Sequence, residues 1–246
     1  MRRLGLVSIS FRSSSPERIV EEVKKAGLSC VEWGSDVHAP CDDSEKLKNI
    51  VRLQKENNIS CCSYGTYFRL GTDSTDELIK YIDAAKTLGT DILRLWCGNK
   101  PANQYTDSEE KALLDDCRKA AEIAEKNGVI LCMECHNGTY THYKEGAIKL
   151  MKEINSPAFR MYWQPNQFLT AQENKKYARL ISSFTKNIHV FNWTEKERFP
   201  LSEAIDIWKE YLSYFNGSET LLLEFMPDDD INSLKTEVHS LKNIAE

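Results

Sequence analysis

Four polar residues near the ends of consecutive apolar segments are the clearest candidates for chemistry in this chain. Glu134 and Glu224 each interrupt a strongly apolar run, VILCME and TLLLEF, and Gln164 and His189 lie in the two apolar segments between them. A buried carboxylate is costly unless it is paired, hydrogen-bonded or bound to a cation. Carboxylate and amide oxygens together with imidazole suit Mn²⁺, Mg²⁺, Co²⁺ or Zn²⁺. The set therefore predicts a divalent-metal site if the four side chains converge.

Each of these residues taken alone has a simpler interpretation. Either glutamate could form a buried ion pair with an arginine or a lysine. His189 could be a hydrogen-bonded core histidine, and Gln164 could be a structural hydrogen-bonding residue. Convergence at one point is what separates a metal site from these alternatives, so the elements that position the side chains decide between them.

Apolar, β-rich segments alternate with amphipathic segments along the whole chain. The apolar segments predict strands over 4–10, 29–33, 59–64, 91–96, 129–135, 159–164, 188–192 and 221–225. Apolar residues at helical spacing predict helices over 16–26, 44–56, 76–88, 143–154, 171–182, 201–214 and 231–244, and one between Thr106 and Gly128. The runs that are apolar at nearly every position are typical of parallel strands covered on both faces. We therefore predict an α/β fold, a single (β/α)8 TIM barrel over residues 1–246.

Helix-capping motifs support this division into elements. Ser15 followed by Pro16 is typical of a helix start. Ser74-x-x-Glu77 and Thr106-x-x-Glu109 have the spacing of capping boxes. The alternative fold, an open doubly wound sheet, is disfavoured because no GxGxxG turn follows the first strand. In a barrel, polar residues at the carboxyl ends of the strands face one mouth, which would bring the four candidates together.

Composition excludes several classes of protein. The chain has 246 residues, 41% of them hydrophobic and 28% charged, and a formal net charge of −5. No apolar run approaches the ~20 residues of a membrane span, and no secretory signal is visible. The acidic balance argues against nucleic-acid or membrane partners. The eight cysteines are irregularly spaced and read as buried free thiols, which predicts a cytoplasmic location.

A second group of residues at or just beyond the strand ends is predicted to bind substrate. Aromatic side chains there could stack on a sugar face, and polar ones could bind hydroxyl groups. His136 is the strongest of them, because it follows Glu134 by two positions and so shares its side of the strand. The group comprises Glu32, His38, Tyr64, Trp96, His136, Trp163, Gln167 and Arg198.

Several short motifs resemble those of the xylose-isomerase-like (β/α)8 superfamily, which contains sugar isomerases and epimerases, hydroxypyruvate isomerase, inosose dehydratase and, more distantly, endonuclease IV. The resemblance covers nearly the whole chain. The motifs that carry it are AGLSCVE over residues 26–32, Glu134-x-His136, His189-x-x-Asn192, and Glu224 in the position of the last metal glutamate.

The resemblance implies that Glu134, Gln164, His189 and Glu224 hold a divalent cation. The family has aspartate where this chain has Gln164, and often histidine where it has Gln167. A neutral amide removes one negative charge from the ligand set, which should weaken binding of a hard dication.

The resemblance further implies a metal-dependent isomerase or epimerase of a sugar or another small hydroxy-carbonyl compound. Glu134 and Glu224 would be the catalytic residues, removing and returning a carbon-bound proton through a metal-stabilised cis-enediolate. Two alternatives remain: a dehydratase or lyase on the same metal site, and a sugar-binding barrel that has lost the activity. The expected partner is a small-molecule carbohydrate, and a homo-oligomer is permitted. A DNA-repair nuclease is disfavoured by the five histidines and the acidic balance.

Overall fold

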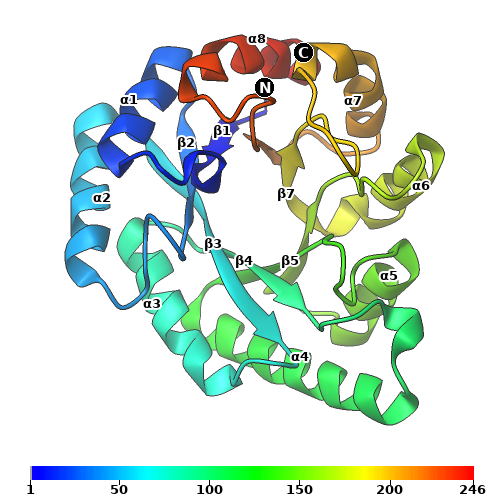
Figure 1. Ribbon diagram of the computed structural model, residues 1–246. Coiled ribbons are helices and arrows are strands. Elements are labelled where there is room, and N and C mark those ends of the chain that lie inside the picture. The colour runs from blue at the N-terminus through cyan, green and yellow to red at the C-terminus, as the bar shows by residue number, and fades with distance from the viewer. Residues whose placement is uncertain (1) are drawn as a thin grey trace.

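The computed structural model describes residues 2–246, which form a closed parallel barrel surrounded by helices (Figure 1). Each strand pairs with the next one in sequence, and β1 closes the barrel against β8. The strands are β1 (Leu4–Val7), β2 (Cys30–Gly34), β3 (Ser60–Leu70), β4 (Ile92–Cys97), β5 (Ile130–Glu134), β6 (Phe159–Trp163), β7 (Thr185–Val190) and β8 (Thr220–Leu223). The predicted (β/α)8 barrel is confirmed.

One helix follows each strand, as predicted. They are α1 (Pro16–Ala26), α2 (Ser44–Asn57), α3 (Leu78–Leu88), α4 (Asp107–Asn127), α5 (Lys144–Ile154), α6 (Ala171–Ile181), α7 (Ile205–Leu212) and α8 (Leu234–Ala245). Short 3-10 turns precede α3, α7 and α8; those before α7 and α8 lie within the ranges predicted as helix, and the one before α3 begins one residue earlier, at Thr75.

Three strands differ by three or more positions from their predicted extents. β7 begins three positions earlier than predicted, at Thr185, and ends at Val190. β1 ends at Val7, and residues 8–11 form a 3-10 turn. The hydroxyl of Ser8 accepts a hydrogen bond from the Gly34 amide and that of Ser10 from the Phe225 amide, so both side chains bond neighbouring backbone beyond the strand. β3 instead runs on to Leu70, because the residues after Gly65 (TYFRL) are mostly aromatic or β-branched and continue the pairing with β4 after a register shift.

Two of the three predicted helix starts are confirmed. The Ser15 side chain caps α1, and Thr106 and Glu109 form the complete capping box of α4. The box predicted at Ser74 is wrong, because the next three residues form a 3-10 turn and Ser74 makes no capping hydrogen bond. The hydroxyl of Thr75 donates instead to Asp116 on α4, which ties this turn to the neighbouring helix.

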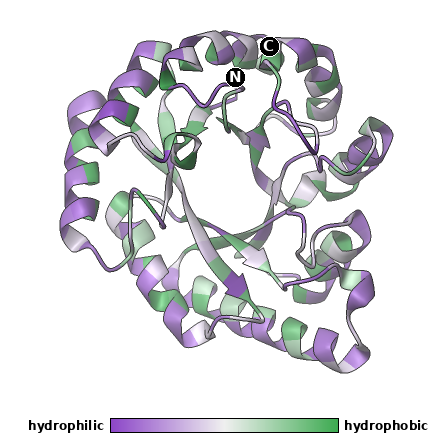
Figure 2. Ribbon diagram, viewed as in Figure 1, coloured by the Kyte–Doolittle hydropathy of each residue, from purple (hydrophilic) through white to green (hydrophobic). Residues whose placement is uncertain are grey.

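The apolar core lies mainly between the barrel and the helices. Each helix carries both hydrophobic and hydrophilic residues (Figure 2), and on α4 the buried ones include Leu113, Cys117 and Ala124. A smaller cluster of buried residues fills part of the barrel interior. It comprises Val7, Ile9, Cys30, Cys62, Cys132, Tyr162 and Leu222. All eight cysteines are free, and every one except Cys41 is buried, as predicted. Within residues 2–246, no helix combines the length and the apolar character needed to cross a bilayer.

Candidate active site

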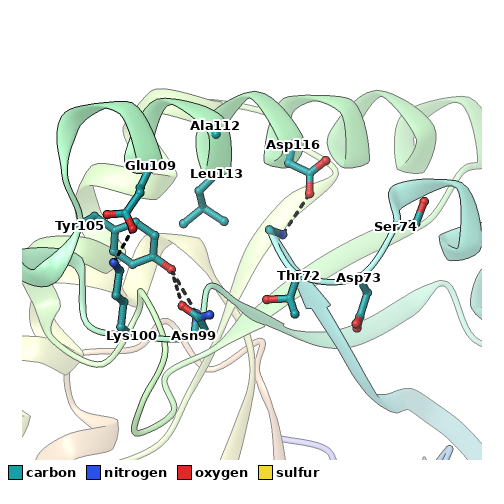
Figure 3. Close-up of a pocket in the computed structure, with 11 residues that line it drawn as sticks. Thr72, Asp73, Ser74, Asn99, Lys100, Tyr105, Glu109, Ala112, Leu113 and Asp116 are labelled. Atoms are coloured by element: carbon teal, nitrogen blue, oxygen red, sulfur yellow. Dashed lines mark hydrogen bonds and ion pairs between the residues drawn. The ribbon is translucent and has the colours of Figure 1, made fainter.

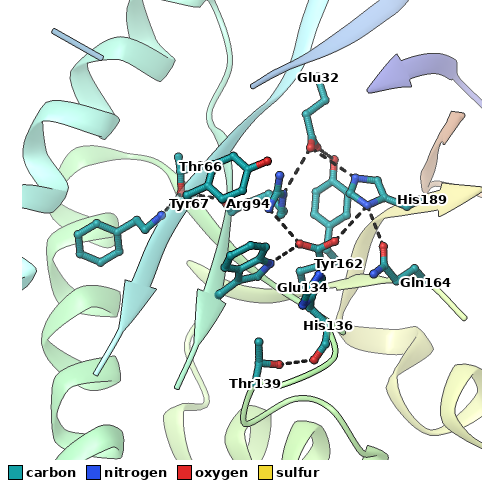
Figure 4. A network of polar contacts seen from close by, with 12 residues as sticks. Glu32, Thr66, Tyr67, Arg94, Glu134, His136, Thr139, Tyr162, Gln164 and His189 are labelled. Carbon is teal, nitrogen blue, oxygen red and sulfur yellow. Dashed lines mark hydrogen bonds and ion pairs between the residues drawn. The ribbon is translucent and has the colours of Figure 1, made fainter. Parts of the chain in front are cut away.

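The four residues singled out as metal ligands converge at the carboxyl end of the barrel. One ligand atom each of Glu134, His189 and Glu224 lies within 4.8 Å of the others, and all three residues are buried. Nδ1 of His189 is 3.4 Å from Oε1 of Glu134, 3.5 Å from Oε2 of Glu224 and 3.0 Å from Oε1 of Gln164. In Figure 4, dashed lines join His189 to Glu134 and to Gln164. One nitrogen and three oxygens from β5 to β8 thus meet at one point.

The spacing of these atoms fits a divalent cation. Two atoms each bonded at about 2.1 Å to a tetrahedral ion lie about 3.4 Å apart, and adjacent ligands of an octahedral ion about 3.0 Å apart. The distances from Nδ1 of His189 to the three oxygens run from 3.0 to 3.5 Å. The donor set, two carboxylates, an amide oxygen and an imidazole, is also one that such ions accept.

Arg94 on β4 is a buried member of this cluster that the sequence analysis missed. Its Nη1 donates to Oε2 of Glu134 at 3.0 Å, and Nε1 of Trp96 donates to the same oxygen at 2.6 Å. Glu134 therefore forms the ion pair considered as an alternative, but through one oxygen only, while its Oε1 faces His189. A signal was available, because Arg94 interrupts the apolar run DILRLW as the glutamates interrupt theirs.

Glu32 lies inside the barrel and not at the mouth. It is fully buried, with Oε1 3.4 Å from Nε2 of His189, and its Oε2 accepts a hydrogen bond from the Tyr162 hydroxyl. Gly65 makes room for it, since a Cβ there would lie 2.7 Å from Oε1 of Glu32. The prediction that Glu32 contacts substrate is corrected: the side chain is shielded from the mouth and faces the imidazole from the other side.

Burial and close charges shift the proton affinities of the cluster. Burial alone would raise the pKa of Glu134, but Arg94 and His189 outweigh it and hold that pKa well below its usual value. Burial raises the pKa of Glu224 to about 7. The negative charge of Glu134 adds to this rise, and His189 opposes it. Burial alone would lower the pKa of His189, but Glu224 and Glu32 outweigh it and raise that pKa to about 10. The two glutamates thus differ in proton affinity.

A cavity of about 210 Å³ opens at the mouth beside the cluster. Glu134, Gln164 and Glu224 line it. Three of the predicted substrate-binding residues also lie there: Trp96, His136 and Gln167. The rings of Trp96 and His136 pack against each other, with centroids 4.7 Å apart.

His38 does not reach this cavity, so its predicted place at the mouth is wrong. The side chain is buried, with Nδ1 3.1 Å from the Ser8 hydroxyl and Nε2 3.1 Å from the Ser14 carbonyl. Both ring nitrogens are therefore occupied by the segment between β1 and α1. Sequence could not reveal these partners, which lie more than twenty residues away.

Tyr64 and Trp163 are also misplaced by the prediction, because they point out of the barrel. Successive side chains of a strand alternate between its two faces. Glu32 pairs in register with Ser63 and faces inward, so Tyr64 faces outward and donates its hydroxyl to the Ala39 carbonyl. Trp163 likewise packs against aromatic rings of the outer layer, Trp208, Tyr211 and Phe215.

Arg198 lies on the loop after β7 and lines an adjoining depression of about 350 Å³ together with His136 and Gln167. Its guanidinium packs over Trp193 and Phe225 and pairs with Asp229. Arg198 is thus near the mouth but does not line the cavity beside Glu134.

A larger cavity of about 720 Å³ lies outside the barrel, between α4 and the loops after β3 and β4 (Figure 3). Its polar groups pair with one another: Lys100 with Glu109, Tyr105 with Asn99, and Asp116 with the Gly71 amide. None of the predicted site residues lines it.

The chain belongs to the xylose isomerase-like TIM barrel family, whose model matches residues 20–213. No curated protein sequence matches the chain significantly. Three solved structures share its fold at low sequence identity. The probable 3-DHS dehydratase AsbF of Bacillus anthracis superposes with a TM-score of 0.83 at 15% identity, covering 98% of this chain and 99% of that one.

The two others are a 3-keto-D-glucoside 4-epimerase of E. coli and a magnesium complex. The epimerase has a TM-score of 0.73 at 10% identity, covering 98% of this chain and 99% of its own. A xylose isomerase-like TIM barrel protein of Mycobacterium smegmatis, solved with magnesium, has a TM-score of 0.73 at 11% identity and covers 100% and 97%. The TM-scores establish the shared fold.

Proposed function

We propose that this chain is a divalent-metal-dependent isomerase or epimerase of a sugar or another small hydroxy-carbonyl compound. The observation that carries the proposal is the convergence of Glu134, His189 and Glu224, with Gln164 beside them, at the mouth of the barrel. The solved structures that resemble this chain include epimerases, and one of these structures is a complex with magnesium.

Charge balance supports a cation at this point. A histidine that binds a metal is neutral, and with His189 in that form the three carboxylates of Glu32, Glu134 and Glu224 face one guanidinium, that of Arg94. The remaining two negative charges are the number that a dication neutralises. Buried charges without such compensation are costly, so a bound dication would stabilise the fully ionised cluster.

A bound dication would polarise a substrate carbonyl and the hydroxyl next to it. Glu134 and Glu224 would then act on the carbon that carries this hydroxyl group. One carboxylate takes the carbon-bound proton, the C–H electron pair becomes part of an enediolate, and a glutamate returns the proton to the neighbouring carbon or to the opposite face. Arg94 and Trp96 hold Oε2 of Glu134, which fixes the orientation of that carboxylate.

A dehydratase on the same residues is the second candidate. Proton removal next to a carbonyl begins both reactions, and the structure with a TM-score of 0.83 is named as a probable dehydratase. The two candidates differ in their products: an isomerase conserves the composition of its substrate, whereas a dehydratase releases water. We also propose a cytoplasmic location, supported by the eight free cysteines.

Metal content of the purified protein tests the proposal. We expect near-stoichiometric Mn, Mg, Co or Zn by elemental analysis after incubation with each cation, and its loss in Glu134→Gln and Glu224→Gln. Glu195→Gln, an exposed glutamate on the loop after β7, is the matched control and should keep the metal. With metal bound, solvent-deuterium exchange into candidate substrates should fall by about 10²-fold or more in both ligand variants. Absence of metal binding in the parent would contradict the proposal, and identified products separate the two reactions.

A further inference from the structure

The two ring nitrogens of His189 face different groups. Nδ1 lies 3.0 to 3.5 Å from oxygens of Glu134, Gln164 and Glu224, the proposed metal ligands. Nε2 lies 3.4 Å from Oε1 of Glu32 on β2, and a dashed line joins the two side chains in Figure 4. The imidazole therefore lies between the proposed ligand set and a further carboxylate that is not part of that set.

Nε2 of His189 is a buried nitrogen that lacks a hydrogen bond. The side chains of His189 and Glu32 are both fully buried. Nε2 makes no hydrogen bond to any residue in the described part of the chain, 2–246. Its 3.4 Å distance to Glu32 exceeds the roughly 2.7–3.2 Å of an N–H···O hydrogen bond by only a few tenths of an ångström. Because an unpaired buried N–H is costly, pairing of Nε2 with this carboxylate is favoured.

The other contacts of Glu32 decide which partner supplies the hydrogen. The side-chain amide of Asn187 on β7 donates to the Tyr162 hydroxyl at 2.7 Å, and this hydroxyl donates to Oε2 of Glu32. Nε of Arg94 lies 3.5 Å from Oε1 and adds a second donor. Since an ionised carboxylate only accepts, its Oε1 can pair with the imidazole only if Nε2 carries a hydrogen.

We propose that Glu32 is a positioning residue for the metal site. It accepts the hydrogen of Nε2 of His189 and so leaves the lone pair of Nδ1 facing the proposed ligand set. A neutral imidazole has one N–H and one lone pair, so fixing the hydrogen at one nitrogen decides which nitrogen can bind an ion. The inference rests on the proposed function in one respect, since the ion is the divalent cation proposed above.

The alternative is that Glu32 serves only as a counter-charge for Arg94. In that case its removal would change the charge of the cluster but would not alter the hydrogen on Nε2 of His189. The charge and the hydrogen bond therefore need separate measurements.

Metal affinity gives the first measurement. Chelator-treated protein is titrated with Zn²⁺ and with Mg²⁺ in competition with a chelating dye. We expect Glu32→Gln to weaken binding by about 10- to 100-fold, as loss of a carboxylate partner of a metal-binding histidine typically does. The amide can turn its N–H₂ group toward Nε2, which favours the hydrogen on Nδ1 instead.

Two further variants separate charge from position. Tyr162→Phe keeps the charge of Glu32 and the ring that packs against His189, but removes the hydroxyl that holds Oε2. It should weaken binding by about 2- to 10-fold, the worth of one hydrogen bond. Glu237→Gln is the matched control: Glu237 is a buried glutamate on α8 that accepts from the Leu201 amide, and its replacement should leave metal affinity unchanged.

The hydrogen on Nε2 of His189 gives the second measurement, by NMR of protein with ¹⁵N-labelled histidine and saturating Zn²⁺ or Mg²⁺. We assign its signal by its loss in His189→Gln. A charge-assisted hydrogen bond to Glu32 should shift this proton downfield and slow its exchange with solvent. In Glu32→Gln the signal should move upfield and exchange faster, whereas Glu237→Gln should leave it unchanged.

Equal metal affinity in the parent and in Glu32→Gln, or an unchanged Nε2 proton, would overturn this inference and leave the proposed function standing. If Glu32→Gln does not fold, judged by its circular dichroism, unchanged affinity in Tyr162→Phe overturns the inference. Absence of metal binding in the parent would overturn both proposals. Metal binding that depends on Glu32, without proton exchange into any substrate, would remove only the isomerase function.

Discussion

Arg94 is the residue on which the buried polar cluster depends most. It contacts Glu134 and Glu32, two carboxylates from strands on either side of it, and all three side chains are almost completely buried. By occupying Oε2 of Glu134, it leaves Oε1 as the oxygen that faces His189. The same glutamate can thus belong to an ion pair and to a metal site.

Replacing Arg94 with methionine should destabilise the protein strongly. Arg94→Met leaves two buried carboxylates without their cation, which typically costs about 3–5 kcal/mol. Urea denaturation measures the change in the free energy of unfolding. Arg118→Met, at an exposed position on α4, should change it by less than about 0.5 kcal/mol. Equal stability of the two variants would mean that Arg94 does not offset the charge of the glutamates.

Gln164 controls the charge of the proposed ligand set. Gln164→Glu keeps the length of the side chain and adds a carboxylate next to His189. We expect Mg²⁺ or Mn²⁺ to bind on the order of tenfold more tightly, since ligand charge tunes the affinity of hard cations. Gln167→Glu adds the same charge to the mouth outside the ligand set and should have a much smaller effect. Calorimetry with each cation measures both, and an unchanged affinity in Gln164→Glu would argue against Gln164 as a ligand.

At the scale of elements, the alternation of side chains along each strand decides which residues enter the barrel. Arg94 and Trp96 lie two positions apart on β4, and Glu134 and His136 lie two positions apart at the end of β5. All four line the mouth cavity. Tyr64 lies out of phase and packs outside the barrel. Counting by two from a known inward residue would have excluded it, so this part of the site was predictable in principle.

Helix α4 provides an element-scale test with a built-in control. Thr106→Ala removes the hydroxyl that accepts from the Glu109 amide, and should lower the free energy of unfolding by about 0.5–2 kcal/mol. Ser74→Ala alters a similar sequence motif whose side chain makes no capping hydrogen bond, so its effect should be near zero. Thermal or urea denaturation compares the two. A larger loss in Ser74→Ala would contradict the structural assignment of the caps.

At the scale of the whole molecule, His38 should make the protein less stable as the pH drops below neutral, whereas Glu224, with its raised pKa, should act in the opposite direction. Burial lowers the pKa of His38, opposed by its hydrogen bond to the Ser14 carbonyl and by Asp36. Above the unfolded-state pKa of about 6.5, both states are neutral and stability does not depend on this group. As the pH falls below that value, the unfolded chain takes up the proton first, so stability declines by at most about 1.4 kcal/mol per pH unit for this proton.

Denaturation of the parent and of His38→Gln at several pH values measures this contribution. The variant should be less stable at pH 7, because it loses the bonds to Ser8 and Ser14, but the difference in stability between parent and variant should shrink as the pH falls from 7 to 5. Equal slopes in the parent and in His38→Gln would contradict the assignment.

Sequence by itself determined the elements, their order and the barrel, because hydrophobic periodicity, caps and turn residues act over a few neighbouring positions. It also singled out Glu134, Gln164, His189 and Glu224 as candidate site residues, since polar groups at the ends of apolar strands are conspicuous. Only the tertiary structure decided what those groups contact. The pairing of Arg94 with Glu134, the position of Glu32 behind His189 and the enclosure of His38 join residues 24 to 157 positions apart. Such contacts follow from the closure and stagger of the barrel, which local sequence patterns do not encode.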